Sequence, residues 1–320
     1  MRIKALVLVT LAYLSDPAHA QRPLTLESKI ELGDIRGRLD HMAVDLRRSR
    51  LFVAQLENDS VGVIDFRTRE IVHVITEAKR PQGLSYSGDT LFVANGGDGS
   101  LRMFEGSQYR GIGRIELGET ADNVRFDAET GHILVSAKAA LAVIDVASRR
   151  KAGDIALMAQ PESFQIDHRS GRIYVNSPKE SAVVVLDPAT GKRLAVWPMG
   201  NASNYPLALN DAMNHVLVVF RDPPKLAALA TSDGSLVAST DSCGDADDMF
   251  VDGKRSRVYV SCGDGHVDVF DAKNYRRLLQ VDTAPGARTS LFVPEVDRLF
   301  VAVRATTETP AAIWVFRPEP

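Results

Sequence analysis

The sequence is poor in the residue patterns that reveal a catalytic or cofactor site. It has only two cysteines, Cys243 and Cys262, in 320 residues, so it contains neither a cysteine-rich zinc site nor a Cys-x-x-Cys-His haem attachment. It also lacks a Gly-x-Ser-x-Gly nucleophile motif, a His-Glu-x-x-His zinc motif and a phosphate-binding glycine loop. We therefore expect no cofactor, and no catalytic residue can be assigned from a motif.

Long apolar runs are also missing, except near the N-terminus. Ala5–Leu14 is apolar, follows Arg2 and Lys4, and precedes the small-x-small sequence Ala18–Ala20. This pattern is typical of a secretory signal peptide, and ten apolar residues are too few to span a bilayer. The sequence thus predicts a signal peptide over residues 1–20, a single mature domain over 21–320, no membrane span, and a periplasmic or secreted location.

An excess of positive charge is absent too. The formal net charge is −3 at pH 7, which gives no electrostatic reason to expect nucleic acid or an anionic membrane as a partner. The hydrophobic fraction of 45% is that of a globular protein.

What the chain does contain is a repeat. A short β-rich run with an aromatic residue or leucine at its centre recurs seven times, 40 to 43 residues apart. This period is close to that of a four-stranded propeller blade. The central residues of the seven runs are Phe52, Phe92, Leu134, Tyr174, Leu217, Tyr259 and Phe300.

One copy, residues 161–199, shows the pattern within a blade. Four β-rich runs alternate with turns rich in Gly, Pro, Asp and Ser, which predicts a four-stranded antiparallel meander. Such a sheet leaves its faces uncovered unless copies stack. The last copy, Arg288–Phe316, has only three strands, whereas Leu24–Leu32 is a strand without a blade. We therefore predict an all-β, seven-bladed β-propeller closed by the N-terminal strand in the last blade.

Three of the second-strand runs resemble the motif of the YVTN-repeat β-propellers, a family often exported by bacteria. They are Leu91–Asn95, Ile173–Asn176 and Val258–Ser261. The resemblance covers residues 24–316 and implies a seven-bladed fold. It carries over no catalytic residue, because the residues of the motif are structural. The fifth copy departs most, with Val218–Phe220 in place of the Asn or Ala ending and Asp222–Pro224 in the following loop.

The residues that precede each first strand should meet at one end of the central channel, and there the copies differ. Variable positions on a repeated scaffold are typical binding sites. The predicted ligand-binding residues are Asp40, His41, Gln82, Asn123, Glu162, Tyr205, Asp247, Asp248 and Arg288, with Asp122, Asn204 and Thr289 beside them. The alternative is a hydrated ring of polar groups that only satisfies the strand ends.

The sixth copy adds two hypotheses. Cys243 and Cys262 should both lie on the variable-loop face of one blade, so we predict a disulfide between them in an oxidising compartment. The segment Asp241–Asp248 contains four carboxylates, but their spacing is not that of a calcium loop. We therefore assign no metal site. Among the basic loop residues, we expect Lys138, Arg221 and Arg304 to lie on a solvated rim.

Two classes of function stay open. The first is an exported binding or scaffold protein, expected to be a monomer, that holds a protein, peptide or small molecule on the variable-loop face and at the channel mouth. The second is a hydrolase or lyase in the same mouth, assisted by a divalent cation. Paired carboxylates there would suit acid–base chemistry, but analogy between propellers is a weak argument.

Overall fold

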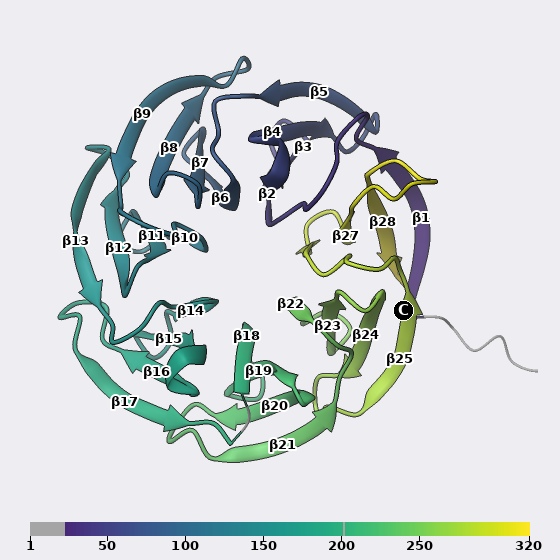
Figure 1. Cartoon of the computed structure of the whole chain (residues 1–320). Helices are drawn as coiled ribbons and strands as arrows, with labels where there is room; N and C mark the ends of the chain where they lie inside the picture. The colour runs from purple at the N-terminus through teal and green to yellow at the C-terminus, as the bar shows by residue number, and fades with distance from the viewer. Residues whose placement is uncertain (1–22, 201) are drawn as a thin grey trace, which may run out of the picture.

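Seven four-stranded antiparallel sheets stand in a ring in the computed structural model, which describes residues 23–200 and 202–320 (Figure 1). The predicted all-β, seven-bladed propeller is therefore confirmed. Sheets one to six each pair four consecutive strands, whereas the seventh combines both ends of the chain in the order β1-β28-β27-β26. The predicted signal peptide, residues 1–20, lies outside the described residues.

The strands have these bounds, blade by blade. Blade 1 contains β2 (Met42–Asp45), β3 (Arg50–Gln55), β4 (Ser60–Asp65) and β5 (Glu70–Ile75). Blade 2 contains β6 (Pro81–Ser87), β7 (Thr90–Asn95), β8 (Ser100–Glu105) and β9 (Arg110–Glu116). Blade 3 contains β10 (Val124–Asp127), β11 (His132–Ala137), β12 (Ala140–Asp145) and β13 (Arg150–Ala156). Blade 4 contains β14 (Phe164–Asp167), β15 (Arg172–Ser177), β16 (Ala182–Leu186) and β17 (Arg193–Pro198).

Blade 5 contains β18 (Ala202–Asn210), β19 (His215–Asp222), β20 (Pro224–Ala230) and β21 (Leu236–Asp241). Blade 6 contains β22 (Ala246–Asp252), β23 (Arg257–Cys262), β24 (His266–Asp271) and β25 (Arg277–Asp282). Blade 7 contains β26 (Ser290–Val293), β27 (Arg298–Val303), β28 (Ala312–Pro318) and β1 (Leu24–Glu31). Two single turns of 3-10 helix, η1 (Leu56–Asn58) and η2 (Pro178–Glu180), join second to third strands in blades 1 and 4.

The seven repeated residues lie at the third position of each second strand and fill the spaces between blades. Phe52, in β3 of blade 1, stacks on Tyr86 of blade 2 with ring centroids 5.3 Å apart. Tyr259 of blade 6 meets Phe292 of blade 7 edge to face at the same distance, 5.3 Å. Each core cluster therefore joins neighbouring sheets, which is why one blade cannot bury its apolar surface alone.

Aspartates end most of the first strands and shape the turns that follow. Asp127, at the end of β10, accepts hydrogen bonds from the backbone N–H of Glu129 at 3.0 Å and from the Thr130 hydroxyl at 2.7 Å. In the next blade, Asp167 accepts the same pair of bonds from Arg169 N–H and the Ser170 hydroxyl. This local bonding is the usual reason for Asp in such turns. The face that carries these turns is called the turn face below.

The last blade is closed as predicted. β1 runs antiparallel to β28, from Leu24 opposite Pro318 to Glu31 opposite Ala312, with one bulge. The strand ends at Glu31, one residue before the predicted boundary. β1 supplies the outer, fourth strand of blade 7, so the two ends of the chain are held together in one sheet and the ring is closed.

Blade 5 is irregular in its first strand. β18 shifts register between Asn204 and Leu207, so Tyr205 is displaced from the regular ladder. The loop sequence at Asp222–Pro224 joins β19 to β20 through a cis peptide bond, and β20 pairs regularly with both neighbours. The same kind of register shift occurs at the start of the first strand in blades 2 and 6, so the feature specific to this copy is the loop at Asp222–Pro224.

Cys243 and Cys262 form a disulfide across 19 residues, as predicted. It ties the segment before β22 to the end of β23 and so fastens the start of β22, where Asp247 and Asp248 lie. No helix within residues 23–200 and 202–320 is both long and apolar enough to cross a membrane.

Candidate functional site

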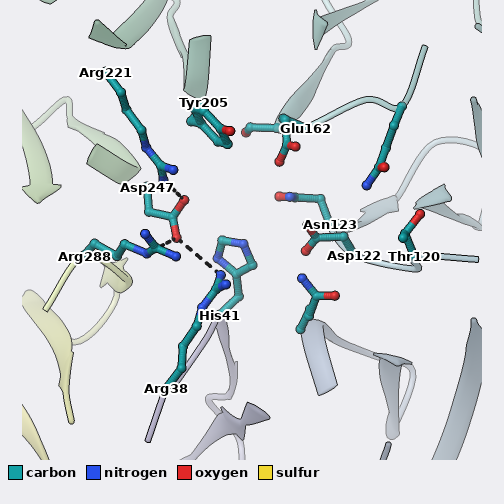
Figure 2. A pocket seen from close by; sticks show the side chains of 13 residues that line it. Arg38, His41, Thr120, Asp122, Asn123, Glu162, Tyr205, Arg221, Asp247 and Arg288 are labelled. Atoms are coloured by element: carbon teal, nitrogen blue, oxygen red, sulfur yellow. Dashed lines mark hydrogen bonds and ion pairs between the residues drawn. The ribbon is translucent and has the colours of Figure 1, made fainter. Parts of the chain in front are cut away.

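A cavity of about 300 Å³ opens at the end of the channel where the first strands begin (Figure 2). All seven blades contribute to its wall, because each first strand starts near the axis of the ring. This cavity is called the funnel. Its lining residues are Arg38, His41, Gln82, Thr120, Asp122, Asn123, Gln160, Glu162, Ser163, Tyr205, Arg221, Asp247 and Arg288.

Most of the residues that the sequence predicted for the site meet here. Seven of them line the funnel: His41, Gln82, Asn123, Glu162, Tyr205, Asp247 and Arg288. Asp40 and Asp248 are buried behind the wall and contact His41 from either side. Asn204 is buried in blade 5, where its amide bonds Asn176 and the Ala182 carbonyl. That any of them binds a ligand stays a prediction.

His41 lies between two carboxylates. Its Nδ1 is 3.3 Å from Asp248 Oδ2, and its Nε2 is 3.9 Å from Asp40 Oδ1. Burial alone would lower the pKa of His41, but the charge and hydrogen bond of Asp248, followed by the charges of Asp40 and Asp122, raise the pKa to about 10. The ring is therefore a cation at neutral pH. Asp248 is further held by the backbone N–H of Ser290 at 2.9 Å.

Three arginines gather around one acid on one side of the funnel. Arg221 Nη2 donates to Asp247 Oδ1 at 2.5 Å, and Arg288 Nε lies 3.1 Å from Oδ2 of the same carboxylate. Arg38 Nη2 is 3.9 Å from Oδ2. Arg221 also lies over the ring of Tyr205, 3.6 Å from its centroid, so its guanidinium is fixed by stacking. We call Arg38, Arg221 and Arg288 the arginine wall.

The opposite side of the funnel has acids and amides without arginines, as Figure 2 shows. We call Asp122, Asn123 and Glu162 the acid wall. Burial, and after it the charge of Asp247, raises the pKa of Glu162. Burial also raises the pKa of Asp122 to about 7, against the opposing charge of His41. Asp122 Oδ1 is buried and has no hydrogen-bond partner among the described residues.

Several residues that line the funnel were not predicted from the sequence. Arg221 was expected on a solvated rim, and this was wrong: its side chain is 18% exposed and pairs with Asp247 inside the funnel. It comes from the end of β19, a second strand, and the selection of residues before each first strand did not include it. Arg38, Thr120, Gln160 and Ser163 were also missed. The first three lie two residues before Asp40, Asp122 and Glu162, and Ser163 directly follows Glu162, so a wider window at each strand start would have included them.

The Asp241–Asp248 segment does not form a metal cage in the described part of the chain. The one group of potential ligand atoms that gathers there within 4.8 Å is Cys243, Cys262 and Asp264. Both sulfurs of this group belong to the disulfide and cannot act as thiolate ligands. Asp245 and Asp247 face Arg288 instead, so arginines neutralise the carboxylates that a cation would need.

Comparisons with known proteins agree with the fold. The chain is a seven-bladed β-propeller. One chain of the solved crystal structure of a mitotic checkpoint complex superposes on it with a TM-score of 0.77, covering 99% of this chain and 98% of that chain. The sequence identity is 11%, so the likeness shows the fold alone. Neither a protein-family model nor a curated protein sequence matches this chain.

The geometry limits what the funnel can do chemically. It offers fixed cations on one side and, on the other, carboxyl groups whose pKa is raised, together with amides that can donate and accept. Such a site can orient a small polar molecule by both of its ends. Asp122, which titrates near neutral pH, could also exchange a proton with a bound molecule.

Proposed function

We propose that this chain is an exported binding protein that holds a small polar ligand in the funnel. The observation that carries the proposal is the convergence of polar side chains from all seven blades on one cavity of about 300 Å³. This volume is at the lower end of the range of ligand pockets, about 300–1,000 Å³. A molecule of the size of an amino acid, a short peptide end or a sugar acid would fill it.

Three further features support the proposal. The funnel retains buried polar atoms without partners, namely Asp122 Oδ1 and Arg38 Nε, and such atoms favour a ligand that satisfies them. The disulfide and the signal-like N-terminus suit an oxidising compartment. The superposed structure is a multiprotein assembly by its own description, so a protein partner that docks on the loops around the funnel is compatible with the same fold.

A panel of polar molecules tests the proposal. Amino acids, short peptides, organic acids and sugars are added to the purified protein, and the melting temperature and calorimetric heats are recorded. We expect at least one class to bind with Kd below about 1 mM, which corresponds to about 4 kcal/mol. Gln82→Ala should weaken binding at least tenfold. Glu129→Gln, on the exposed turn face, is the matched control and should not. Absence of binding throughout the panel would reject the proposal.

A hydrolase or lyase in the same funnel is the second candidate. It is favoured by one observation, the pKa of Asp122 near 7 beside a protonated His41. An enzyme would convert the ligand found in the panel, and Asp122→Asn would abolish conversion while leaving binding within about threefold. A ligand recovered unchanged after long incubation, with and without added divalent cation, would exclude this candidate for that ligand.

A further inference from the structure

The arginine wall encloses a carboxylate that belongs to the protein itself. Arg221 and Arg288 contact the two oxygens of Asp247 from different blades, and Arg38 lies beyond at 3.9 Å. In Figure 2 the three guanidinium groups point toward Asp247 from three sides. Paired N–H groups of arginine match the planar geometry of a carboxylate. We propose that the arginine wall is a subsite for the carboxylate of a small ligand, and that Asp247 occupies this subsite until the ligand displaces it.

Asp247 does not satisfy all the hydrogen-bonding groups of the arginine wall. An incomplete fit is needed if a ligand is to displace it. Its Oδ2 is buried, and although it lies near Arg288 Nε it has no hydrogen bond of good geometry. Arg38 Nε is buried and has no hydrogen-bond partner among the described residues. A buried polar group without a partner costs about 1–3 kcal/mol. A ligand carboxylate that enters from the funnel is free to take the orientation that accepts hydrogen bonds from Arg38 Nε and Arg288 Nε, whereas Asp247 is tethered to β22.

The charges around the wall point to an anion and not to a cation. Asp40 pairs with Arg38 at 3.0 Å, and Asp245 receives Arg288 at 2.9 Å. Asp40 and Asp245 thus partly neutralise the wall when Asp247 moves aside. One positive charge of the wall is then left without a carboxylate partner, since His41 is already paired with Asp248. An incoming carboxylate restores the balance, while an incoming cation would meet three guanidinium groups.

Neighbouring contacts keep the arginines in place when Asp247 leaves. Arg221 is held by the ring of Tyr205 and by a bond from its Nε to the Ala246 carbonyl at 2.8 Å. Arg288 is held by both oxygens of Asp245. The subsite is therefore preorganised by residues that do not belong to the exchange.

The inference rests on the proposed binding function, and it predicts a rank order in the wild-type protein. A ligand that carries a carboxylate should bind at least tenfold more tightly than its amide or methyl ester. The acid wall on the opposite side then contacts the rest of that molecule. Equal affinity for acid and amide would contradict the inference, even though the funnel would still be a binding site.

Removal of the occupant gives the sharper experiment, because it needs no knowledge of the natural ligand. The probes are sodium acetate and sodium formate, titrated at constant ionic strength against Asp247→Ala, with sodium chloride as the blank. We expect saturable binding in the millimolar range, at least tenfold tighter than to the wild type. Asp282→Ala is the matched control, because it removes an exposed acid from the same blade, and it should gain nothing. Inorganic phosphate is the competing probe.

Each outcome decides the proposal. A gain for acetate in Asp247→Ala that disappears when Arg288→Met is added supports the subsite. Equal behaviour of Asp247→Ala and Asp282→Ala overturns it, as does binding of phosphate without acetate. If Asp247→Ala unfolds on its own, acetate should restore its folding, and Asp247→Ser should show the same rescue; no rescue of either variant overturns the proposal. If the wild type binds none of the panel while acetate rescue succeeds, the proposed function fails and the subsite stands.

Discussion

Two aspartates lie at opposite ends of the same strand, and their environments differ completely. Asp127 is the last residue of β10, on the turn face, whereas Asp122 lies two residues before the strand begins, in the funnel. Burial would raise the pKa of Asp127, but hydrogen bonds from Thr130 and the backbone N–H of Glu129 outweigh it and lower the pKa. Burial raises the pKa of Asp122 to about 7, with no hydrogen bond to compensate.

The comparison separates acids that build the fold from acids that are available for function. On the turn face, Asp is bonded by its own turn, so its charge is satisfied within a few residues. In the funnel, Asp122 faces the charges of other blades, and after burial the charges of Asp40 and Glu162 raise its pKa. The residue type is the same at the two ends, and burial acts to raise the pKa at both. What differs is whether donors are supplied locally.

Replacing Asp122 and Asp127 by alanine should give the largest difference between the two positions. Asp127→Ala leaves two backbone N–H groups and the Thr130 hydroxyl without an acceptor, so we expect a loss of about 3 kcal/mol in the free energy of unfolding. Asp122→Ala removes a buried carboxyl that neighbouring charges disfavour when it is ionised, and so should not lower the free energy of unfolding at pH 7.5. Urea unfolding of both variants measures the difference, and equal losses would contradict the division between the two faces.

The pH dependence of stability should separate Asp122 from Asp127 by a smaller amount. The pKa of Asp122 is about 7 in the folded chain and about 3.9 in the unfolded chain. Between these two pH values the folded state binds more protons than the unfolded state. The contribution of Asp122 to the free energy of unfolding is therefore fully present at low pH and is lost as the pH rises toward 7. We take this contribution as about 2 kcal/mol. This is half of the value that the full pKa difference gives, because the funnel is open to water, which screens the charges.

Asp122→Asn should therefore gain about 2 kcal/mol relative to the wild type between pH 4.5 and pH 8. Asp127→Asn provides the control. Its lowered pKa makes its contribution present above about pH 4 and lost only below, so its difference from the wild type should stay constant over the same range. Unfolding free energies at five pH values give both curves. A flat difference for Asp122→Asn would show that its carboxyl does not titrate near neutrality.

Single hydroxyls in the turns give the smallest effect. Thr130 and Ser170 donate to the second oxygen of Asp127 and Asp167 at 2.7 Å and 2.6 Å. Thr130→Val and Ser170→Ala should each cost about 1 kcal/mol, and should cost the same amount because the two turns share their geometry. Chemical unfolding of both variants, with Ser148→Ala in an exposed turn of blade 3 as a reference, tests this equivalence. Losses that differ by more than about twofold would mean that the blades do not share one turn.

The amino-acid sequence alone determined what depends on short range. The blade period, the closing strand from Leu24, the turn aspartates and the disulfide partners all follow from spacing and from local turn chemistry. It also placed seven of the nine selected residues in the funnel wall, because the start of each first strand always faces the axis. Counting the strands along the sequence is enough to find these positions.

Only the tertiary structure decided how the selected residues are paired. His41 meets Asp248 across 207 residues of sequence, and Arg221 is held inside the funnel by Asp247 of blade 6 and by the ring of Tyr205. The pKa values of Asp122 and His41 arise from charges on other blades. Closure of the ring brings these groups within a few ångströms of one another. Electrostatic interaction depends on that distance and on burial, and neither quantity is encoded in any single repeat.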